Sequence, residues 1–206
     1  YDGVIVAHGT DTLAYTVNLT AFVLSKIALP FVFIAADYPL DQKRSNGIAN
    51  LLAALDFIDA GENGVFAVYR NEDQHILVHR GGRLRQMDDL YASFMSQRKI
   101  PFGEISDGRF VYNENPLNPR TFPKPTALQN TALSRHILRI FPYPGLDYGI
   151  FQLADVRAVL VETYHSATFC TAGEGENLNT FLSRLCETIP VFIAGGQSGE
   201  ERYKSD

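Results

Sequence analysis

Near its start the chain carries the run Val4-Ile5-Val6-Ala7-His8-Gly9-Thr10-Asp11-Thr12. Four consecutive apolar residues followed by a polar turn with a glycine are typical of a parallel strand that is buried on both faces. From Leu13 apolar residues recur at helical spacing, which predicts a helix to about Leu29, where Pro30 stops it. The run therefore predicts a strand, a turn and a helix, with the polar turn at the carboxyl end of the strand.

The alternation of apolar runs and helical patterns continues along the chain. A second apolar run, Phe31–Ala35, is followed by a helical pattern over residues 48–60 and by a third apolar run at Val65–Tyr69. This order predicts an α/β fold with a doubly wound, mainly parallel sheet. Ligands of such sheets bind at the carboxyl ends of the strands, which here precede His8–Thr12 and Ala36–Arg44.

The chain changes character between Asn113 and Leu128, where it becomes rich in proline and asparagine. Such a segment fits neither a helix nor a central strand, so we interpret it as a linker. A smaller α/β pattern follows, with strands predicted at 136–141, 158–162 and 190–194 and a helix at 176–187. We expect a large N-terminal domain over residues 1–112, a linker over 113–130 and an incomplete smaller α/β domain over 131–206.

The composition excludes several classes of protein. The chain has 206 residues, of which 46% are hydrophobic and 20% charged, which is typical of a globular protein. A formal net charge of -5 argues against direct binding of nucleic acid. No apolar run is long enough to cross a membrane, and the 2 cysteines cannot provide a disulfide framework.

The two ends of the sequence indicate a longer protein. The chain opens at Tyr1 without an initiator methionine or a signal-type segment and enters an apolar run within a few residues. It stops at Asp206, shortly after a glycine-rich turn, without an obvious closing helix. We therefore expect the sequence to be a fragment.

The turn His8–Thr12 has two interpretations. Thr and Asp side chains at the start of a helix commonly accept hydrogen bonds from free backbone N–H groups, so the turn can be a helix cap. Alternatively, a hydroxyl and a carboxylate meet at the carboxyl edge of a parallel sheet, where Thr10 can act in nucleophilic or proton-relay chemistry and Asp11 can bind an ammonium group. The residues alone leave both interpretations open.

A resemblance to a known family favours the second interpretation. Asp2–Thr16 resembles the second signature of the bacterial-type L-asparaginase family, and its Ala14-Tyr15-Thr16 ending is closer to the cytoplasmic, type I-like branch than to the periplasmic one. Further segments resemble the family's motifs in the same order along the chain: Tyr38–Leu40, Arg44–Leu55, Ala92–Ser96, Phe141–Gly145 and Val161–Thr168.

The resemblance implies hydrolysis of L-asparagine, a small amino-acid amide, to L-aspartate and ammonia. It also implies a cytoplasmic homodimer or homotetramer that needs no metal or other cofactor. Thr10 matches the second of the family's two catalytic threonines, and Asp11 matches the residue that binds the substrate's amino group. His8 and Asp37 are further candidates for substrate binding. The family's first threonine lies in a Thr-Gly-Gly-Thr-Ile strand without a match here, so we expect the fragment to lack the primary nucleophile and to be inactive by itself.

The chain departs from the family at the catalytic lysine. The family pattern Arg-Gly-x-Arg-x-x-Lys puts Gln86 at the lysine position, whereas counting back from Phe94 puts Arg85 there. Arginine stays protonated and glutamine does not titrate, so neither side chain replaces a general base. A further departure is Thr168, which stands where the family has an asparagine that reaches the active site of a neighbouring subunit.

Two alternatives to an asparaginase remain. The first is the asparaginase-like subunit of a tRNA-dependent amidotransferase, which releases ammonia from a free amide donor for use on charged tRNA. The second is a non-catalytic homologue that binds an amino acid and has lost the lysine. A metal site is not expected, because His75 and His79 have no cysteine or carboxylate partner at matching spacing.

Overall fold

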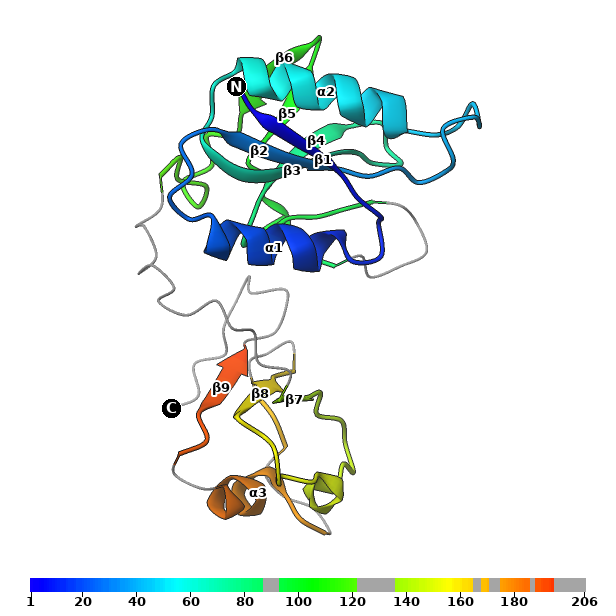
Figure 1. Cartoon of the computed structure of the whole chain (residues 1–206). Helices are drawn as coiled ribbons and strands as arrows, with labels where there is room; N and C mark the ends of the chain where they lie inside the picture. The colour runs from blue at the N-terminus through cyan, green and yellow to red at the C-terminus, as the bar shows by residue number, and fades with distance from the viewer. Residues whose placement is uncertain (87–92, 122–135, 165–167, 171–174, 186–187, 195–206) are drawn as a thin grey trace. The chain divides into compact units, whose positions relative to one another are not determined.

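The computed structural model describes residues 1–86, 93–121, 136–164, 168–170, 175–185 and 188–194. Contacts divide the chain into two compact units, residues 1–131 and residues 132–206 (Figure 1). Each unit contains its own sheet and its own buried core. Among the described residues, no helix is both long and apolar enough to span a lipid bilayer.

The larger unit is built on a six-stranded mixed sheet in which the strands lie side by side in chain order (Figure 1). The first three strands are parallel to one another, and each later strand is antiparallel to its neighbour. The strands are β1 (Val4–Ala7), β2 (Pro30–Ile34), β3 (Gly64–Arg70), β4 (Ile76–Arg80), β5 (Gly103–Ser106) and β6 (Arg109–Tyr112). The predicted α/β class is confirmed, but β5 and β6 were not predicted.

Two helices cover opposite faces of this sheet, α1 (Leu13–Val23) on one face and α2 (Gly47–Asp59) on the other (Figure 1). On the α1 face, Leu13 and Val17 pack against Tyr69 of β3 in one buried cluster. On the α2 face, a second cluster places Phe57 against Phe66 of β3, with ring centroids 4.7 Å apart. Burial of each such side chain contributes about 1.5–3 kcal/mol, so both layers are stabilised by apolar packing.

The first predicted helix extends too far at its carboxyl end. Helix α1 ends at Val23 rather than near Leu29, because β2 already begins at Pro30 and the chain must reverse its direction in between. The reversal is made by a turn in which the Ile27 N–H donates to the Leu24 carbonyl. Connections of a few residues are normal between a helix and a strand, and the helical spacing of the apolar residues concealed this one.

The smaller unit contains a three-stranded parallel sheet in the order β7-β8-β9. Its strands are β7 (Ile137–Ile140), β8 (Ala158–Glu162) and β9 (Val191–Ala194). Helix α3 (Leu178–Arg184) packs Phe181 onto this sheet, next to Tyr148 in the short 3-10 helix η2 (Tyr148–Ile150). Another 3-10 helix, η1 (Gln97–Lys99), belongs to the larger unit.

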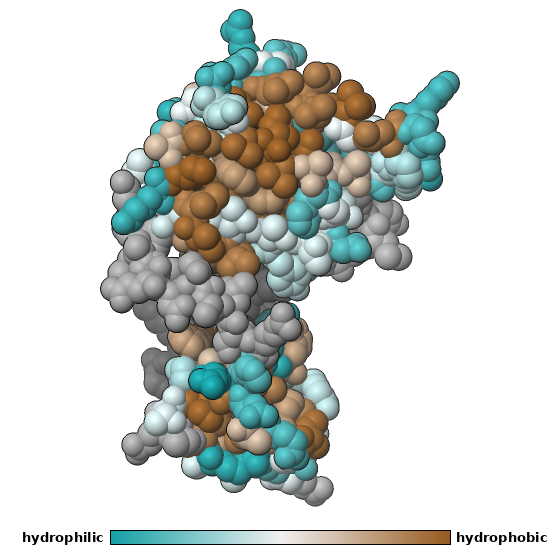
Figure 2. Space-filling view, in the orientation of Figure 1, coloured by the Kyte–Doolittle hydropathy of each residue, from teal (hydrophilic) through white to brown (hydrophobic). Residues whose placement is uncertain are grey.

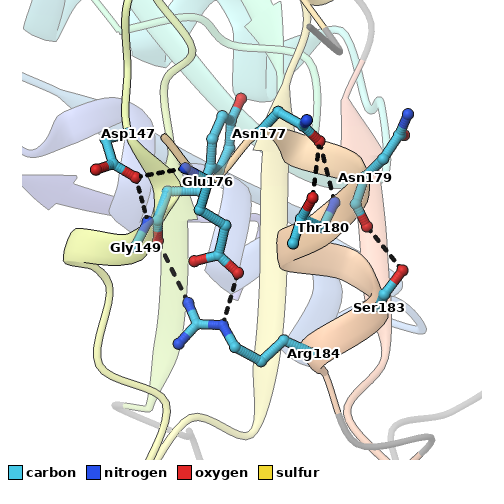
Figure 3. Close-up of polar contacts among 9 residues, drawn as sticks. Asp147, Gly149, Glu176, Asn177, Asn179, Thr180, Ser183 and Arg184 are labelled. Carbon is cyan, nitrogen blue, oxygen red and sulfur yellow. Dashed lines mark hydrogen bonds and ion pairs between the residues drawn. The ribbon is translucent and has the colours of Figure 1, made fainter. Parts of the chain in front are cut away.

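Polar contacts join η2 to the start of α3 (Figure 3). One carboxylate oxygen of Asp147 accepts hydrogen bonds from the backbone N–H groups of Gly149 and Glu176, at 2.9 and 3.0 Å. The Glu176 carboxylate pairs with Arg184 at 2.8 Å. Asn177 caps α3 by accepting from the Thr180 N–H, so the helix starts at residue 178 and not at 176 as predicted.

Asp147 gives the smaller unit a testable dependence on pH. The hydrogen bonds from Gly149 and then Glu176 hold the pKa of the Asp147 carboxyl below its usual value. Because the pKa is lower in the folded state, the charged carboxylate stabilises the fold above its unfolded pKa of about 4. That contribution is lost as the pH falls through the folded pKa.

We therefore expect Asp147→Asn to be less stable than the wild type near neutral pH and to lose less stability on acidification to about pH 2. Urea denaturation at several pH values, followed through the amide NMR signals of residues 137–162, measures both effects. Asp155→Asn is the matched control, because Asp155 is exposed. Equal acid dependence in Asp147→Asn and the wild type would contradict the assigned role.

Candidate active site

The loop His8–Thr12 connects β1 to α1 at the carboxyl edge of the parallel strands. The His8 N–H donates to the Ile34 carbonyl at 2.8 Å, so the pairing of β1 with β2 continues one residue into the loop. The His8 ring lies edge-on to Phe33 and its Nδ1 is 2.8 Å from the Gly9 carbonyl oxygen. His8 thus fixes the entry to the loop, and its predicted contact with substrate stays a prediction.

Thr10 and Asp11 do not cap the helix that follows them. Helix α1 begins at Leu13, and the side chain of its N-cap residue, Thr12, forms no capping hydrogen bond. Within the described residues, neither the Thr10 hydroxyl nor the Asp11 carboxylate has a hydrogen bond, and Asp11 is exposed. The capping interpretation is therefore not supported, and a role of Thr10 and Asp11 in a functional site stays a prediction.

Gln86 contacts this loop from a position far along the sequence. Its Nε2 donates to the backbone carbonyl of Asp11 at 2.9 Å. Its Oε1 is buried and has no hydrogen-bond partner among the described residues. Arg85 is half-buried, and its backbone N–H donates to the Met95 carbonyl. Gln86, one of the two candidates for the lysine position, therefore has a hydrogen bond to the loop of Thr10 and Asp11.

Asp37 follows β2 at the same edge and closes a reciprocal pair of hydrogen bonds. One of its carboxylate oxygens accepts from the backbone N–H groups of Tyr38 and Asn46, at 2.8 and 2.9 Å. The Asn46 Oδ1 in turn accepts from the Asp37 N–H at 3.0 Å. This carboxylate thus shapes the loop after β2, and substrate binding by Asp37 remains a prediction.

Two buried asparagines, Asn46 and Asn50, join the strands behind this edge. The Asn50 side chain donates to the Ala35 carbonyl and accepts from the Arg70 N–H, at 2.8 and 2.7 Å. The Asn46 side chain donates to the Arg70 carbonyl at 2.8 Å. The sequence analysis did not assign these roles, although two amides four residues apart on a helix rich in leucine and alanine were a signal.

The last of the predicted site residues, Thr168, belongs to the smaller unit. Thr168 is exposed in the smaller unit, where its carbonyl accepts from the Tyr164 N–H. The glycine-rich turn near the end of the sequence (residues 195–199) lies outside the described residues.

The two histidines considered for a metal site, His75 and His79, lie in different surroundings. His75 is exposed and lies 3.6 Å from Glu104. His79 is fully buried, and its Nδ1 is 2.8 Å from the Ser96 hydroxyl. Burial lowers the pKa of His79 to about 3, so its ring is neutral at physiological pH. In the described part of the chain, no three histidine, cysteine, aspartate or glutamate side chains gather closely enough to hold a metal ion.

Comparisons with known proteins point to one family. The family model described as "Asparaginase, N-terminal" matches residues 1–118. The chain is 30% identical over 166 residues to a glutamyl-tRNA(Gln) amidotransferase subunit of Thermoplasma acidophilum, covering 78% of this chain and 39% of that protein. It is 35% identical over 108 residues to the corresponding protein from Methanopyrus kandleri, covering 50% and 24%. The chain thus spans less than half the length of these curated relatives.

Solved structures agree on the fold. The thermostable L-asparaginase from Thermococcus kodakarensis superposes with a TM-score of 0.74 at 22% identity, covering 94% of this chain and 56% of that one. L-asparaginase I from Vibrio cholerae superposes with a TM-score of 0.71 at 26% identity, covering 93% and 57%. Both matches extend over the two units of this chain and carry the same α/β fold.

Asn50 braces the sheet by linking the Ala35 carbonyl to the Arg70 N–H, so replacing its side chain should destabilise the fold. Asn50→Ala leaves the Ala35 carbonyl and the Arg70 N–H without their partner in a buried setting. We expect the free energy of unfolding to fall by about 2 kcal/mol or more, since each buried unsatisfied group costs about 1–3 kcal/mol. Urea denaturation measures the change. Asn63→Ala, at an exposed turn, is the control, and an equal stability of the two variants would refute the bracing role.

Proposed function

The chain belongs to the asparaginase family, and from this premise we propose that the protein containing it hydrolyses the side-chain amide of L-asparagine. The observation that carries the proposal is the pairing of Thr10 and Asp11 on the loop after β1. Their hydroxyl and carboxylate have no partner among the described residues and lie at the edge where parallel α/β sheets bind ligands.

The proposed reaction divides its roles between these two residues. The Asp11 carboxylate binds the α-ammonium group of asparagine, so the side-chain amide is presented to the Thr10 hydroxyl. The amide C–N bond breaks, the nitrogen leaves as ammonia, and water supplies the oxygen that completes the new carboxylate of aspartate. Gln86 positions Asp11 through its hydrogen bond to the Asp11 carbonyl.

The replaced lysine changes how the proton is handled. Glutamine and arginine side chains do not act as general bases, so neither Gln86 nor Arg85 replaces the lysine in accepting a proton. The proton that Thr10 takes up or passes on during activation of the nucleophile must therefore go to a group other than these two. Within this proposal, the protein either activates Thr10 through a different base or turns over slowly.

We also propose that the complete protein adds a strand to the free edge of β1. Among the described residues, β1 pairs only with β2, and Val4, Ile5 and Val6 remain half-buried although all are apolar. Figure 2 shows apolar surface gathered over α2 and the adjoining sheet edge. It includes the exposed side chains of Ile48, Leu51, Leu52 and Leu55. The family's Thr-Gly-Gly-Thr-Ile strand would pair with the backbone N–H and C=O groups of such an edge and would bring the first threonine beside the Thr10 loop.

The proposal also covers the oligomeric state, because it assigns Thr168 to the site of a neighbouring subunit. The family's asparagine at the Thr168 position reaches the active site of a neighbouring subunit. We therefore place Thr168 in the site of a second copy within a cytoplasmic homodimer or homotetramer. Its position in the smaller unit, on a loop after β8, is compatible with such a contribution.

A second candidate function is supported by the curated relatives. The proteins of 30% and 35% identity are named as subunits of glutamyl-tRNA(Gln) amidotransferase. In that role, the protein would perform the same amide cleavage and pass the ammonia on to a charged tRNA with a partner protein. Ammonia release from free asparagine without tRNA favours the asparaginase, and release that requires the tRNA and a partner favours the amidotransferase.

Replacement of the Thr10 hydroxyl tests the site. In the complete protein, Thr10→Val should lower ammonia release from asparagine by about a hundredfold or more, because the group that acts on the amide is lost. Thr20→Val, a matched change within α1, should keep the wild-type rate. Unchanged activity in Thr10→Val would show that the site is misplaced. Binding of asparagine by calorimetry without any ammonia release would instead favour the non-catalytic homologue.

Introducing a lysine tests which residue, 85 or 86, stands at the position of the family's catalytic lysine. Because Gln86 contacts the Asp11 loop, Gln86→Lys should increase kcat for asparagine in the complete protein, whereas Arg85→Lys should not. A gain confined to Arg85→Lys would assign the lysine position to residue 85 instead. Steady-state ammonia assays across the pH range also separate a restored base, which shifts the pH profile, from a change in KM alone.

A further inference from the structure

Helix α1, which covers one face of the six-stranded sheet, exposes an uncharged apolar stripe on its outer side (Figure 1). Leu13 and Val17 are buried against the sheet, and the helix contains no charged residue. All four of its exposed residues are apolar: Tyr15, Leu19, Phe22 and Val23, with exposed fractions of 58%, 39%, 52% and 47%. Their spacing of i, i+4, i+7 and i+8 places them side by side along the helix. A surface helix normally has charged residues on its outer face, so this stripe indicates a surface that a partner covers.

The stripe is large enough to form one half of a symmetric interface. A fully exposed aromatic side chain offers about 150–250 Å² and leucine or valine somewhat less, so the four exposed fractions leave about 400 Å² of mainly apolar surface. Two copies paired about a two-fold axis would bury about 800 Å² of such surface. Because about 57–65% of a protein interface is apolar, the total buried area would be about 1,200–1,400 Å². Specific interfaces begin at about 1,200 Å².

The charges at the two ends of α1 are complementary in an antiparallel pairing of two copies. Asp11 precedes the helix and Lys26 follows it, and both residues are exposed. A two-fold axis at Leu19 brings Lys26 of one copy opposite Thr12 of the other, beside Asp11. Opposite charges then meet at both ends of the pair, and the two helix dipoles run in opposite directions. A second copy of the chain therefore matches the stripe in charge as well as in area.

A cavity next to the stripe offers a recess for an aromatic ring of the second copy. The cavity has a volume of about 630 Å³, and Phe22, Leu24 and Ile27 contribute apolar side chains to its lining. In the antiparallel pairing, Tyr15 of the second copy lies opposite Val23, next to this recess. A tyrosine ring seated in a pocket is typical of the side chains that carry most of the binding energy of an interface.

The stripe is separate from the sheet edge to which we assign an added strand. Helix α1 packs mainly on β3, whose neighbours are β2 and β4, whereas the free edge belongs to β1. A strand added beside β1 would lie about 14 Å from β3, at three strand spacings of about 4.8 Å. Such a strand extends the sheet in its own plane and leaves the outer side of α1 uncovered.

We propose that two copies of this chain pair antiparallel through the stripe of α1, with Leu19 at the two-fold axis and Tyr15 of each copy in the recess of the other. The pairing rests on the oligomeric state proposed above and assigns a contact surface to it. Since the loop His8–Thr12 leads directly into α1, the pairing also places Lys26 of each copy close to the candidate active-site loop of the other.

Opposite charges introduced at Leu19 test the pairing by sedimentation velocity of the 206-residue chain. Leu19→Glu and Leu19→Lys each bring two like charges together at the axis, so each variant alone should be a monomer where the wild type is a dimer. A 1:1 mixture of the two variants should form a dimer again, because the charges at the axis are then opposite. Leu52→Glu changes an exposed leucine of α2 and should leave the dimer unchanged.

Tyr15→Ser is a milder change, which keeps the test valid where a charge at Leu19 lowers the melting temperature. It should raise the Kd of the dimer about tenfold or more, and an unchanged Kd would contradict the pairing. A monomeric wild type contradicts the proposed oligomer together with this interface. A wild-type dimer that both Leu19 variants retain, an equal dissociation by Leu52→Glu, or a 1:1 mixture that stays monomeric overturns this interface alone.

Discussion

Asn50 has no exposed surface, and its side chain links the carbonyl at the end of β2 to the N–H group at the end of β3. A buried amide is tolerated only where its polar atoms are paired, so this contact determines how α2 lies against the sheet. Asn46, one helical turn earlier, then reaches both Arg70 and Asp37. The shape of the carboxyl edge thus follows from two amides on one helix, and the loop with Thr10 and Asp11 adjoins it through the pairing of β1 with β2.

The parallel half of the larger sheet could be predicted from the sequence because its strands are continuous apolar runs separated by helical patterns. The last two antiparallel strands, β5 and β6, could not, since they are short and carry charged and polar residues between their apolar ones. Gly103 also weakens the strand signal of β5. Its position requires glycine, because a Cβ there would lie 2.3 Å from the Val111 carbonyl oxygen.

The position of Thr10 and Asp11 at the carboxyl edge of the sheet could be predicted because a loop after a buried parallel strand lies there whatever the details of packing. The sequence could not decide whether Gln86 or Arg85 occupies the lysine position, because the two ways of counting to that position end on adjacent residues. The hydrogen bond that favours Gln86 joins residues 11 and 86, and such a contact exists only in the folded chain. The engagement of Asp37 by Asn46 was missed for the same reason.

The free edge of β1 has a consequence for the behaviour of the chain in solution. An edge strand with free N–H and C=O groups is a template for pairing with any other extended segment, and natural sheets usually protect it with charges, prolines or bulges. Here Val4, Ile5 and Val6 offer none of these, and the adjoining leucines of α2 add adhesive surface. During synthesis and refolding, the open edge of β1 and the adjoining leucines of α2 favour aggregation. The solubility of the chain therefore depends on how soon another segment covers this surface.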